Sequence, residues 1–290
     1  MKYDYVFFEG ASLSRRPPVR EAAIRATVRP ESCDSDTREF LAALFETVGL
    51  RLEVYRLKSL LRRLPACLRL LRTTSVVEAR RRVAADPVLA REALGVVLLG
   101  VTEFFRDTAV FGCLEHRVLP ELLAQHRRLR IWSAACSDGQ ELYSIAMLLA
   151  AAGRLEGCEL LGTDCRREAI LHAKSGRFEA EWVRRLEERW RDRYFTSGVL
   201  QCEIKPELAG HLDWRVEDLF RGVEPGPWQV ILWRNMAIYL EGGAAARLWR
   251  EICDALAPEG YLVTGRADYP PKDLPLERIA TSVFRKYSAA

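Results

Sequence analysis

A short loop of small and polar residues, from Ala135 to Gly139, separates two strongly apolar segments of the sequence. The segment before it, residues 129–134, reads as a strand, and from residue 140 the apolar positions have helical spacing. A strand that turns sharply into a helix exposes backbone N–H groups at the turn, and the first amides of the helix point at the same place. The loop is therefore a candidate ligand-binding site.

An acidic residue, Asp164, ends the next apolar segment, 25 residues after Gly139. Ligands of open parallel sheets bind beyond the carboxyl ends of the strands, and a carboxylate there is suited to accept hydrogen bonds from two ribose hydroxyls. The loop contains no G-x-G-x-x-G and no Gly-Lys-Ser/Thr, which disfavours a dinucleotide pyrophosphate and a triphosphate. A nucleoside without phosphates, such as S-adenosylmethionine, fits this pattern, although the signal alone leaves other α/β folds open.

The elements that would position these residues occupy residues 100–290, where short apolar segments alternate with helical stretches. This alternation predicts a doubly wound α/β domain. We expect a seven-stranded, mostly parallel sheet with one reversed pair of strands at its edge. Strands are expected at residues 128–134, 158–164, 212–218, 228–234 and 261–267, with a closing edge strand within 276–288. Residues 177–211 are expected to form an insertion with one charged helix and a small hairpin.

The first third of the chain has a different character. Residues 1–36 show no clear period and are interpreted as an N-terminal extension, whereas residues 37–99 have helical spacing, with Asp36–Thr37 as the expected cap of the first helix. Between residues 51 and 82 there are ten lysines and arginines against two glutamates. These charges are either solvated helix faces or a surface for an acidic partner, and five of them can share one helix side: Arg56, Lys58, Arg62, Arg63 and Arg69.

Composition excludes several classes of protein. A net charge of +4 is too mild to imply a nucleic-acid partner, and no apolar segment is long enough to cross a membrane. The N-terminal segment lacks the apolar region and cleavage site of a signal peptide, so we expect a cytoplasmic protein without membrane insertion. The eight cysteines include no C-x-x-C pair and no histidine at zinc spacing, which predicts reduced thiols and no metal site.

Five segments occur in a fixed order: GVTEFFRD (100–107), IWSAACSDGQELYSIAML (131–148), GTDCRREAILHAKSGRF (162–178), RYF (193–195) and ILWRNMAIYL (231–240). Together they resemble the CheR family, whose pattern is T-x-F-F-R, W-S-A-G-C-S-x-G-E-E-P-Y-S, A-T-D-I and C-R-N-V-x-I-Y-F. Members of that family are S-adenosylmethionine-dependent methyltransferases that esterify glutamates on chemoreceptors. Over roughly residues 38–288, the resemblance implies a small all-helical N-terminal domain followed by a Rossmann-like methyltransferase domain with a small β insertion.

The resemblance also implies which residues meet the reactive end of the cofactor. Thr102 and Arg106, on the segment that joins the two domains, would contact the methionine end of S-adenosylmethionine. Glu141 would bind the ammonium of its amino-acid portion. Arg106 and Tyr239 would stand nearest the transferred methyl group, and these two are the predicted catalytic residues.

The adenosine end is assigned by the same resemblance. Asp164 would hold the ribose, and Asp218 and Leu219 would flank the adenine. Trp233 and Arg234 would contribute at the fourth strand. We therefore predict S-adenosylmethionine as the cofactor.

The sequence departs from the family pattern at several positions. These are Gly100 for Asn, Ala135 for Gly, Gln140 for Glu, Leu142 for Pro, Asp218 for Asn, Trp233 for Cys, and Gly265-Arg266-Ala267-Asp268 for G-H-S-E. The alanine adds a methyl group where backbone comes close to the ligand. Because Arg106, Glu141 and Asp164 are kept, we expect cofactor binding to be retained.

The expected chemistry needs few side chains. A glutamate carboxylate, with a pKa of about 4.3, is ionised at neutral pH and needs no general base, so positioning carries the catalysis. Arg106 is expected to orient the incoming carboxylate, and Tyr239 to donate a hydrogen bond to it. The lack of a Ser/His/Asp or metal constellation is therefore no argument against an enzyme.

The predicted partners are the acidic methylation helices of chemoreceptors, steered by the basic N-terminal helix. Family members that dock a receptor's C-terminal peptide carry a longer, Gly-rich loop in the insertion. Here the corresponding segment, YFTSGVLQCEIKPEL, is tight, so we expect no such tether. We expect a monomer and no nucleic-acid partner.

Two other functions are weighed against this one. The departures at Gly100, Ala135, Gln140 and Trp233 favour a non-catalytic protein that binds S-adenosylmethionine and acts as a regulator or scaffold. An RNA methyltransferase would use the Arg-rich helix on phosphates and show a steep dependence on salt. No basic stretch with interleaved aromatic residues supports base stacking.

Overall fold

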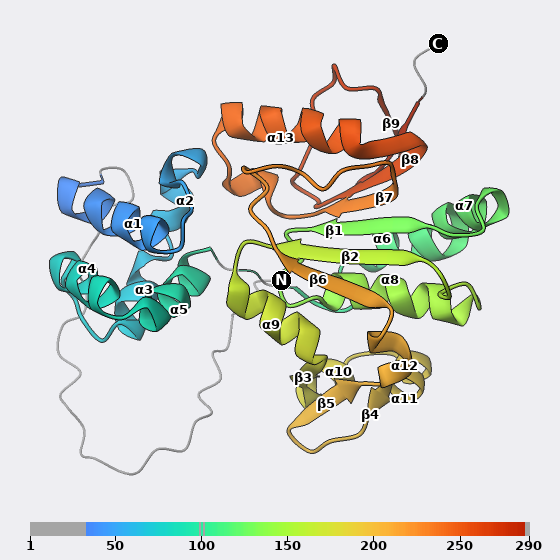
Figure 1. Cartoon of the computed structure of the whole chain (residues 1–290), viewed down its shortest axis with the longest axis horizontal. Helices are drawn as coiled ribbons and strands as arrows, with labels where there is room; N and C mark the ends of the chain where they lie inside the picture. The colour runs from blue at the N-terminus through green and yellow to red at the C-terminus, as the bar shows by residue number, and fades with distance from the viewer. Residues whose placement is uncertain (1–32, 99, 101, 288–290) are drawn as a thin grey trace, which may run out of the picture.

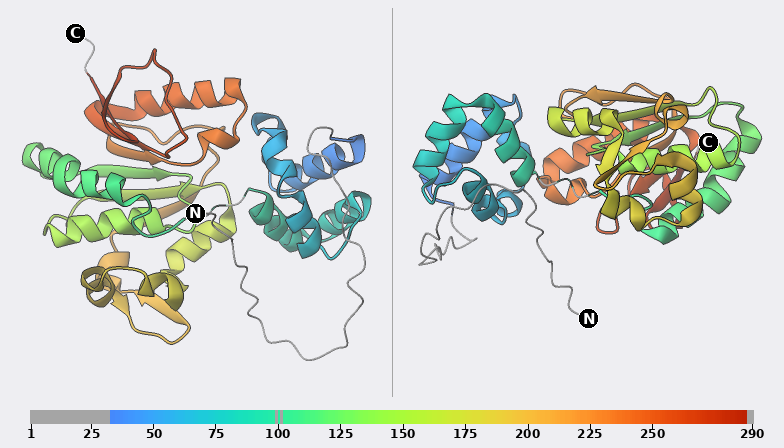
Figure 2. Two further views of the ribbon diagram at one scale, coloured as in Figure 1. Left: turned by 180° about the vertical axis from the view of Figure 1, so that it is seen from behind. Right: turned by 90° about the horizontal axis from the view of Figure 1, so that it is seen from below.

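The computed structural model describes residues 33–98, 100 and 102–287, so most of the predicted extension at residues 1–36 lies outside the described part. A group of short helices stands beside a larger unit built around a sheet (Figures 1 and 2). This arrangement confirms the predicted fold class, a helical N-terminal region followed by a Rossmann-like α/β domain.

The helical part consists of α1 (Ser35–Thr47), η1 (Leu52–Val54), α2 (Leu57–Leu61), α3 (Leu64–Leu70), α4 (Val76–Ala85) and α5 (Pro87–Val97). The cap of α1 is Asp34 and not Asp36–Thr37, because Asp34 has extended backbone and its carboxylate accepts a 2.7 Å hydrogen bond from the Thr37 N–H. Asp86 caps α5 in the same way, with Pro87 in the first turn.

The basic residues predicted to share one side of a helix are divided between two short helices, α2 and α3, and the cap positions at their ends. The helical run breaks between α2 and α3, at Arg62–Arg63, where Pro65 takes a place in the first turn of the new helix. Proline lacks an N–H and is tolerated there, whereas inside a continuous helix it would remove a hydrogen bond. All five cations are exposed: Arg56, Lys58, Arg62, Arg63 and Arg69.

The central sheet has seven strands in the order β6-β2-β1-β7-β8-β10-β9. They are β1 (Arg130–Ala134), β2 (Glu159–Asp164), β6 (Leu212–Val216), β7 (Trp228–Trp233), β8 (Leu256–Thr264), β9 (Leu276–Ala280) and β10 (Val283–Lys286). The first five in this order are parallel. The expected closing edge strand is a hairpin, and only β10 is reversed, because it lies between β8 and β9 and is antiparallel to both. The expected reversed pair is therefore one reversed strand.

Helices cover both faces of this sheet (Figure 1). Helix α13 (Gly242–Ala255) packs on one face, in the apolar core that also contains the N-terminal helices. The other face packs against α6 (Thr108–Cys113), the π-helical turn η2 (Leu114–Val118), α7 (Leu119–Gln125) and α8 (Gln140–Ala151). Helix α9 (Arg167–Ser175) connects β2 to the insertion.

The insertion contains a second, three-stranded sheet in the order β3-β5-β4. Its elements are β3 (Arg177–Glu179), α10 (Ala180–Arg184), α11 (Glu188–Tyr194), β4 (Phe195–Thr196), β5 (Gln201–Ile204) and α12 (Pro206–Ala209). The predicted single charged helix is two helices, because the chain turns at residues 185–187 and the backbone of Glu187 is not helical (φ −56°, ψ 145°). This turn lets Leu186 pack into the same core as the buried Val183 and Trp190.

A strip of backbone pairing joins the helical part to the sheet. Tyr55 pairs with Leu240 in an isolated antiparallel bridge, and the Arg56 N–H donates to the Tyr239 carbonyl at 2.8 Å. The Tyr55 ring lies edge-on to Phe45 of α1 at 5.2 Å and to Phe220 beyond β6 at 6.2 Å. Helices and sheet therefore share one core.

We predict that Tyr55→Ala lowers the free energy of unfolding by about 3 kcal/mol, since it empties a buried aromatic site. The variant should also separate the unfolding of the two parts. All seven tryptophans lie beyond residue 130, so their fluorescence reports on the sheet, whereas far-UV circular dichroism reports on both parts. In urea, the two signals should coincide for the wild-type chain and separate for Tyr55→Ala. The matched control is Tyr269→Ala, a tyrosine that is 71% exposed; a similar loss there would contradict the prediction.

Candidate active site

The predicted site residues gather at the carboxyl ends of four adjacent strands, β6, β2, β1 and β7. Asp164 is the last residue of β2, Asp218 and Leu219 follow β6, and Arg234 follows β7. Within the sheet, β2 and then β6 lie on one side of β1, and the next strand along the chain, β7, lies on its other side. Such a reversal of strand order opens a crevice where ligands of α/β proteins bind.

The loop after β1 is folded by three residues with left-handed backbone. These are Ala135 (φ 58°), Ser137 (φ 54°) and Gly139 (φ 89°). A Cβ at Gly139 would lie 2.6 Å from the Trp214 ring, so only glycine fits there. Burial raises the pKa of the Cys136 thiol, which therefore stays neutral. The loop thus presents backbone and not a nucleophile.

Asp164 is buried, and its carboxylate accepts four hydrogen bonds. Its Oδ2 accepts from the Ser137 N–H at 2.9 Å, which fixes the loop to the end of β2. The other three donors belong to Arg166: its N–H, Nε and Nη2, at 2.9, 2.9 and 3.0 Å. Arg166 was not among the predicted site residues, although a cation two positions after the predicted ribose acid was a visible signal.

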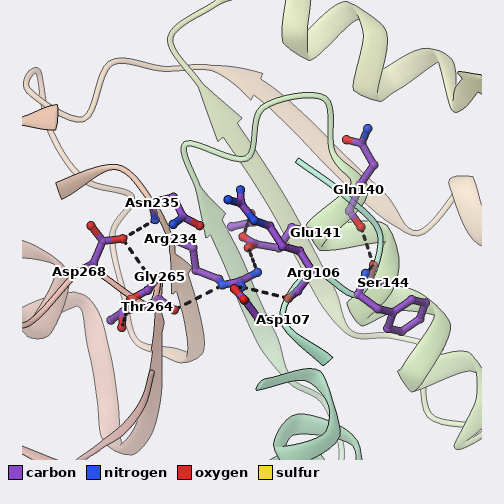
Figure 3. A network of polar contacts seen from close by, with 12 residues as sticks. Arg106, Asp107, Gln140, Glu141, Ser144, Arg234, Asn235, Thr264, Gly265 and Asp268 are labelled. Carbon is purple, nitrogen blue, oxygen red and sulfur yellow. Dashed lines mark hydrogen bonds and ion pairs between the residues drawn. The ribbon is translucent and has the colours of Figure 1, made fainter. Parts of the chain in front are cut away.

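Arg234 organises the other half of the site (Figure 3). Its side chain is 3% exposed and donates to Glu141 Oε2 at 3.0 Å and to Asp107 Oδ2 at 2.5 Å. It also donates to the backbone carbonyls of Arg106 at 3.0 Å and Thr264 at 3.4 Å. One buried guanidinium thus joins the segment before α6, the start of α8, β7 and the end of β8.

The segment that carries Arg106 is tightly constrained. Phe105 and Asp107, on either side of it, both have left-handed backbone, with φ of 51° and 64°. The Phe105 N–H donates to the Ser144 hydroxyl at 2.9 Å, and the Phe105 ring stacks on Trp190 of the insertion at 5.0 Å. The half-buried Arg106 side chain lies beside Glu141 and Arg234 (Figure 3). Non-glycine residues in this conformation concentrate at functional sites.

Tyr239, the second predicted catalytic residue, lies in the short turn η3 (Ala237–Tyr239) after β7 and is half-buried. Asp268 holds this turn, since its carboxylate accepts from the backbone N–H groups of Asn235, Ile238 (3.1 Å) and Gly265 (3.2 Å). Burial raises the pKa of Asp268, and these three N–H groups oppose the rise. Asp268 is the residue at which the sequence replaces the Glu of G-H-S-E.

The remaining predicted residues differ in how deeply their side chains are buried and in which direction they point. Thr102 is half-buried on the linking segment, and Leu219 is buried. Asp218 is half-buried, and its Oδ1 accepts from the Phe220 N–H at 3.0 Å. The Trp233 side chain does not join the others, because it is fully buried against Trp249 of α13 at 4.4 Å.

Two buried polar groups near the site have no hydrogen-bond partner in the described part of the chain. They are the Trp233 indole N–H and both polar atoms of the Gln140 side-chain amide. The Gln140 amide points away from the Arg234 network (Figure 3). Both positions depart from the family pattern.

The polar groups gathered here are of the kinds that bind a nucleoside with an amino-acid arm, and they are not arranged as metal ligands. A carboxylate ends β2, a backbone loop faces it, and a second carboxylate, Glu141, lies beside Arg106 and Arg234. Among the described residues, no group of three or more His, Cys, Asp or Glu side chains could hold a metal ion. In the same residues, no helix combines the length and apolar character needed to cross a bilayer.

Comparison with known proteins identifies the family. Residues 100–281 match the CheR methyltransferase, SAM binding domain. A chemotaxis protein methyltransferase of Listeria monocytogenes is 26% identical over 236 residues, covering 81% of this chain and 90% of that protein. Chemotaxis protein methyltransferase Cher2 of Pseudomonas putida is 30% identical over 207 residues, covering 67% and 75%. The chain belongs to the CheR methyltransferase family, which confirms the predicted methyltransferase class and the cofactor S-adenosylmethionine.

We predict that Ala135→Gly raises the free energy of unfolding by about 0.5–1 kcal/mol, because glycine adopts left-handed backbone without the clash of a Cβ. Urea denaturation measures the change. The control is Ala152→Gly, at the end of α8, where φ is −78° and glycine brings only added flexibility. Equal destabilisation by both substitutions would contradict the strain at Ala135.

We predict that Arg234→Leu destabilises the protein by about 3–5 kcal/mol, since it leaves two carboxylates without their buried partner. Arg234→Lys should recover little, because a single ammonium cannot reach all four acceptors. Arg247→Leu is the matched control, as this arginine is 52% exposed and pairs with Glu251 one helical turn away. Thermal unfolding of the three variants measures the difference, and similar losses for Leu at positions 234 and 247 would refute the prediction.

Proposed function

We propose that this protein transfers a methyl group to glutamate carboxylates of chemoreceptors and forms methyl esters. The observation that supports the proposal most directly is the joint placement of Arg106, Glu141 and Arg234 at the carboxyl end of the sheet, in a chain whose residues 100–281 match the CheR domain. The curated relatives carry the name chemotaxis protein methyltransferase, which supports a receptor as substrate. A cytoplasmic location and a monomeric state are part of the same proposal.

In this proposal, Asp164 holds the ribose, Asp218 and Leu219 flank the adenine, and Glu141 binds the ammonium of the amino-acid portion. Thr102 and Arg106 lie at the methionine end, while Arg234 keeps Glu141 and the Arg106 backbone in place. The backbone around Trp233 lines the site, since its side chain is in the core. Bound S-adenosylmethionine would supply an electrophilic methyl group.

The protein's own catalytic contribution is orientation. The substrate carboxylate is ionised at neutral pH and needs no base. Arg106 directs one of its oxygens, and Tyr239 donates a hydrogen bond to it. The left-handed backbone at Phe105 and Asp107 and the Asp268 contacts around η3 hold the backbone that carries both side chains, which lowers the entropic barrier to reaction.

The exposed cations of α2 and α3 suit an acidic receptor helix. One of these cations, Arg56, donates its backbone N–H to the Tyr239 carbonyl, so charge steering would lead the substrate to the catalytic turn. Residues 197–200 join β4 to β5 in a short turn, which supports the absence of a peptide tether at the insertion. The family match does not favour the non-catalytic alternative.

The decisive assay is transfer of tritiated methyl groups to a receptor-containing membrane fraction. Release of the label by mild base identifies esters, since methylated lysine or RNA does not lose the label under these conditions. Saturable, base-labile labelling is the expected result. Cofactor binding without any labelling would instead support a regulator or scaffold.

We predict that Arg106→Ala lowers methyl transfer by at least 100-fold and cofactor affinity by less than tenfold, with each tenfold corresponding to about 1.4 kcal/mol. Arg106→Lys should restore little, because a point charge does not reproduce the planar fork. Arg117→Ala, an exposed arginine of η2, serves as the control. Equal losses of affinity and turnover in Arg106→Ala would exclude a role in orienting the substrate.

A further inference from the structure

The carboxylate of Asp164 has no acceptor position left for a ligand. An ionised carboxylate offers about four lone-pair directions. The Ser137 N–H takes one, and the three donors of Arg166 take the rest. Two of these bonds come from the Arg166 guanidinium and the other two from backbone. A ribose diol can therefore reach Asp164 only where the guanidinium leaves.

The ion pair between Arg166 and Asp164 is well protected from solvent. The two side chains are 13% and 4% exposed. Burial alone would lower the pKa of Arg166, but the charge of Asp164 and its hydrogen bonds outweigh burial and raise it. The guanidinium therefore stays charged at every physiological pH, and proton loss does not release it.

Gly100 makes room for this arrangement. A Cβ at Gly100 would stand 2.6 Å from Nη1 of Arg166 and closer still to Nη2. The Ser137 hydroxyl would lie as close to the same Cβ as Nη2 does, so a side chain at position 100 would displace the guanidinium and also press on this hydroxyl. The two residues thus form a matched pair, in which the missing side chain at 100 accommodates the long one at 166.

We propose that Arg166 is an internal competitor for the ribose: its guanidinium occupies the ribose acceptor of the cofactor site and sets the cofactor affinity below that of a free Asp164. The inference rests on the proposed placement of the ribose at Asp164. Binding exchanges two hydrogen bonds from Arg166 for two from the ribose hydroxyls, so the gain from ribose recognition is reduced by the loss of the ion pair.

The displaced guanidinium has a second carboxylate within electrostatic reach. Burial raises the pKa of Asp138 in the adjoining loop, and the charges of His172 and Arg166 oppose this rise. Asp138 is half-buried, and its nearest ion-pair contact is His172 at 4.0 Å. A guanidinium that leaves Asp164 therefore still lies in the field of a second carboxylate, that of Asp138.

Isothermal titration with S-adenosylhomocysteine tests the proposal, because binding is read without turnover. Arg166→Ala should bind the ligand at least about tenfold more tightly than the wild-type chain, the scale of one lost charge-assisted contact. The matched control is Arg167→Ala, the exposed neighbour at the start of α9, which removes the same charge and should leave the affinity unchanged.

A second variant would free the Asp164 carboxylate from the guanidinium without removing Arg166. Gly100→Ala should displace the guanidinium and also tighten binding, and the double variant should bind no more tightly than the stronger single one. Thermal unfolding of each free variant verifies that it is folded. Ligand-observed NMR with adenosine and 2′,3′-dideoxyadenosine then locates the effect, since the gain in Arg166→Ala should vanish for the ligand without hydroxyls.

The outcomes separate this inference from the proposed function. Weaker or unchanged binding in Arg166→Ala overturns the inference, because the arginine then holds the ligand or does not touch it. If Asp164→Ala still weakens wild-type binding in that case, the proposed ribose site stands. If Asp164→Ala also has no effect, the ribose lies elsewhere and both fail. Tighter binding in Arg166→Ala and Gly100→Ala, but not in Arg167→Ala, establishes the competitor.

Discussion

The site depends on one buried cation. Arg234 has two carboxylates and two backbone carbonyls as partners, and these are spread along the chain from Arg106 to Thr264. Burying a guanidinium is unfavourable unless every donor finds an acceptor, so the presence of Arg234 at the end of β7 obliges the surrounding segments to converge. The left-handed residues on either side of Arg106 persist because this convergence over-determines them.

Much of the fold could be predicted from the sequence because the spacing of apolar residues differs between helices and strands. The strands β1, β2, β6 and β7 and the helices α8, α9 and α13 follow from alternating apolar segments, and the acid at the end of β2 marks the ligand edge. The errors have local causes. Pro65 divides a helix that spacing alone presents as continuous, and β10 enters the sheet between two strands, which no one-dimensional pattern encodes.

The site was harder to predict because side-chain direction is a tertiary property. Trp233 and Arg234 are neighbours, yet strand alternation sends one into the α13 core and the other into the polar network. The position of Arg166 depends on the missing side chain of Gly100, 66 positions earlier in the chain, because the guanidinium occupies that space. Family motifs name positions that touch a ligand, but they do not indicate which neighbouring side chain donates to the same carboxylate.

The strip that pairs residues 54–56 with residues 239–241 has a consequence for how a substrate is selected. It fixes the separation between Arg56, an exposed cation at the start of α2, and the turn that carries Tyr239. Under the proposed function, a receptor helix held by its acidic residues on α2 and α3 would present to the site only a glutamate at one distance along its axis. A helix rises about 1.5 Å per residue, so a fixed distance corresponds to a fixed number of residues. The strip would therefore select the modified glutamate by its distance from the bound acidic residues and not by the residues around it.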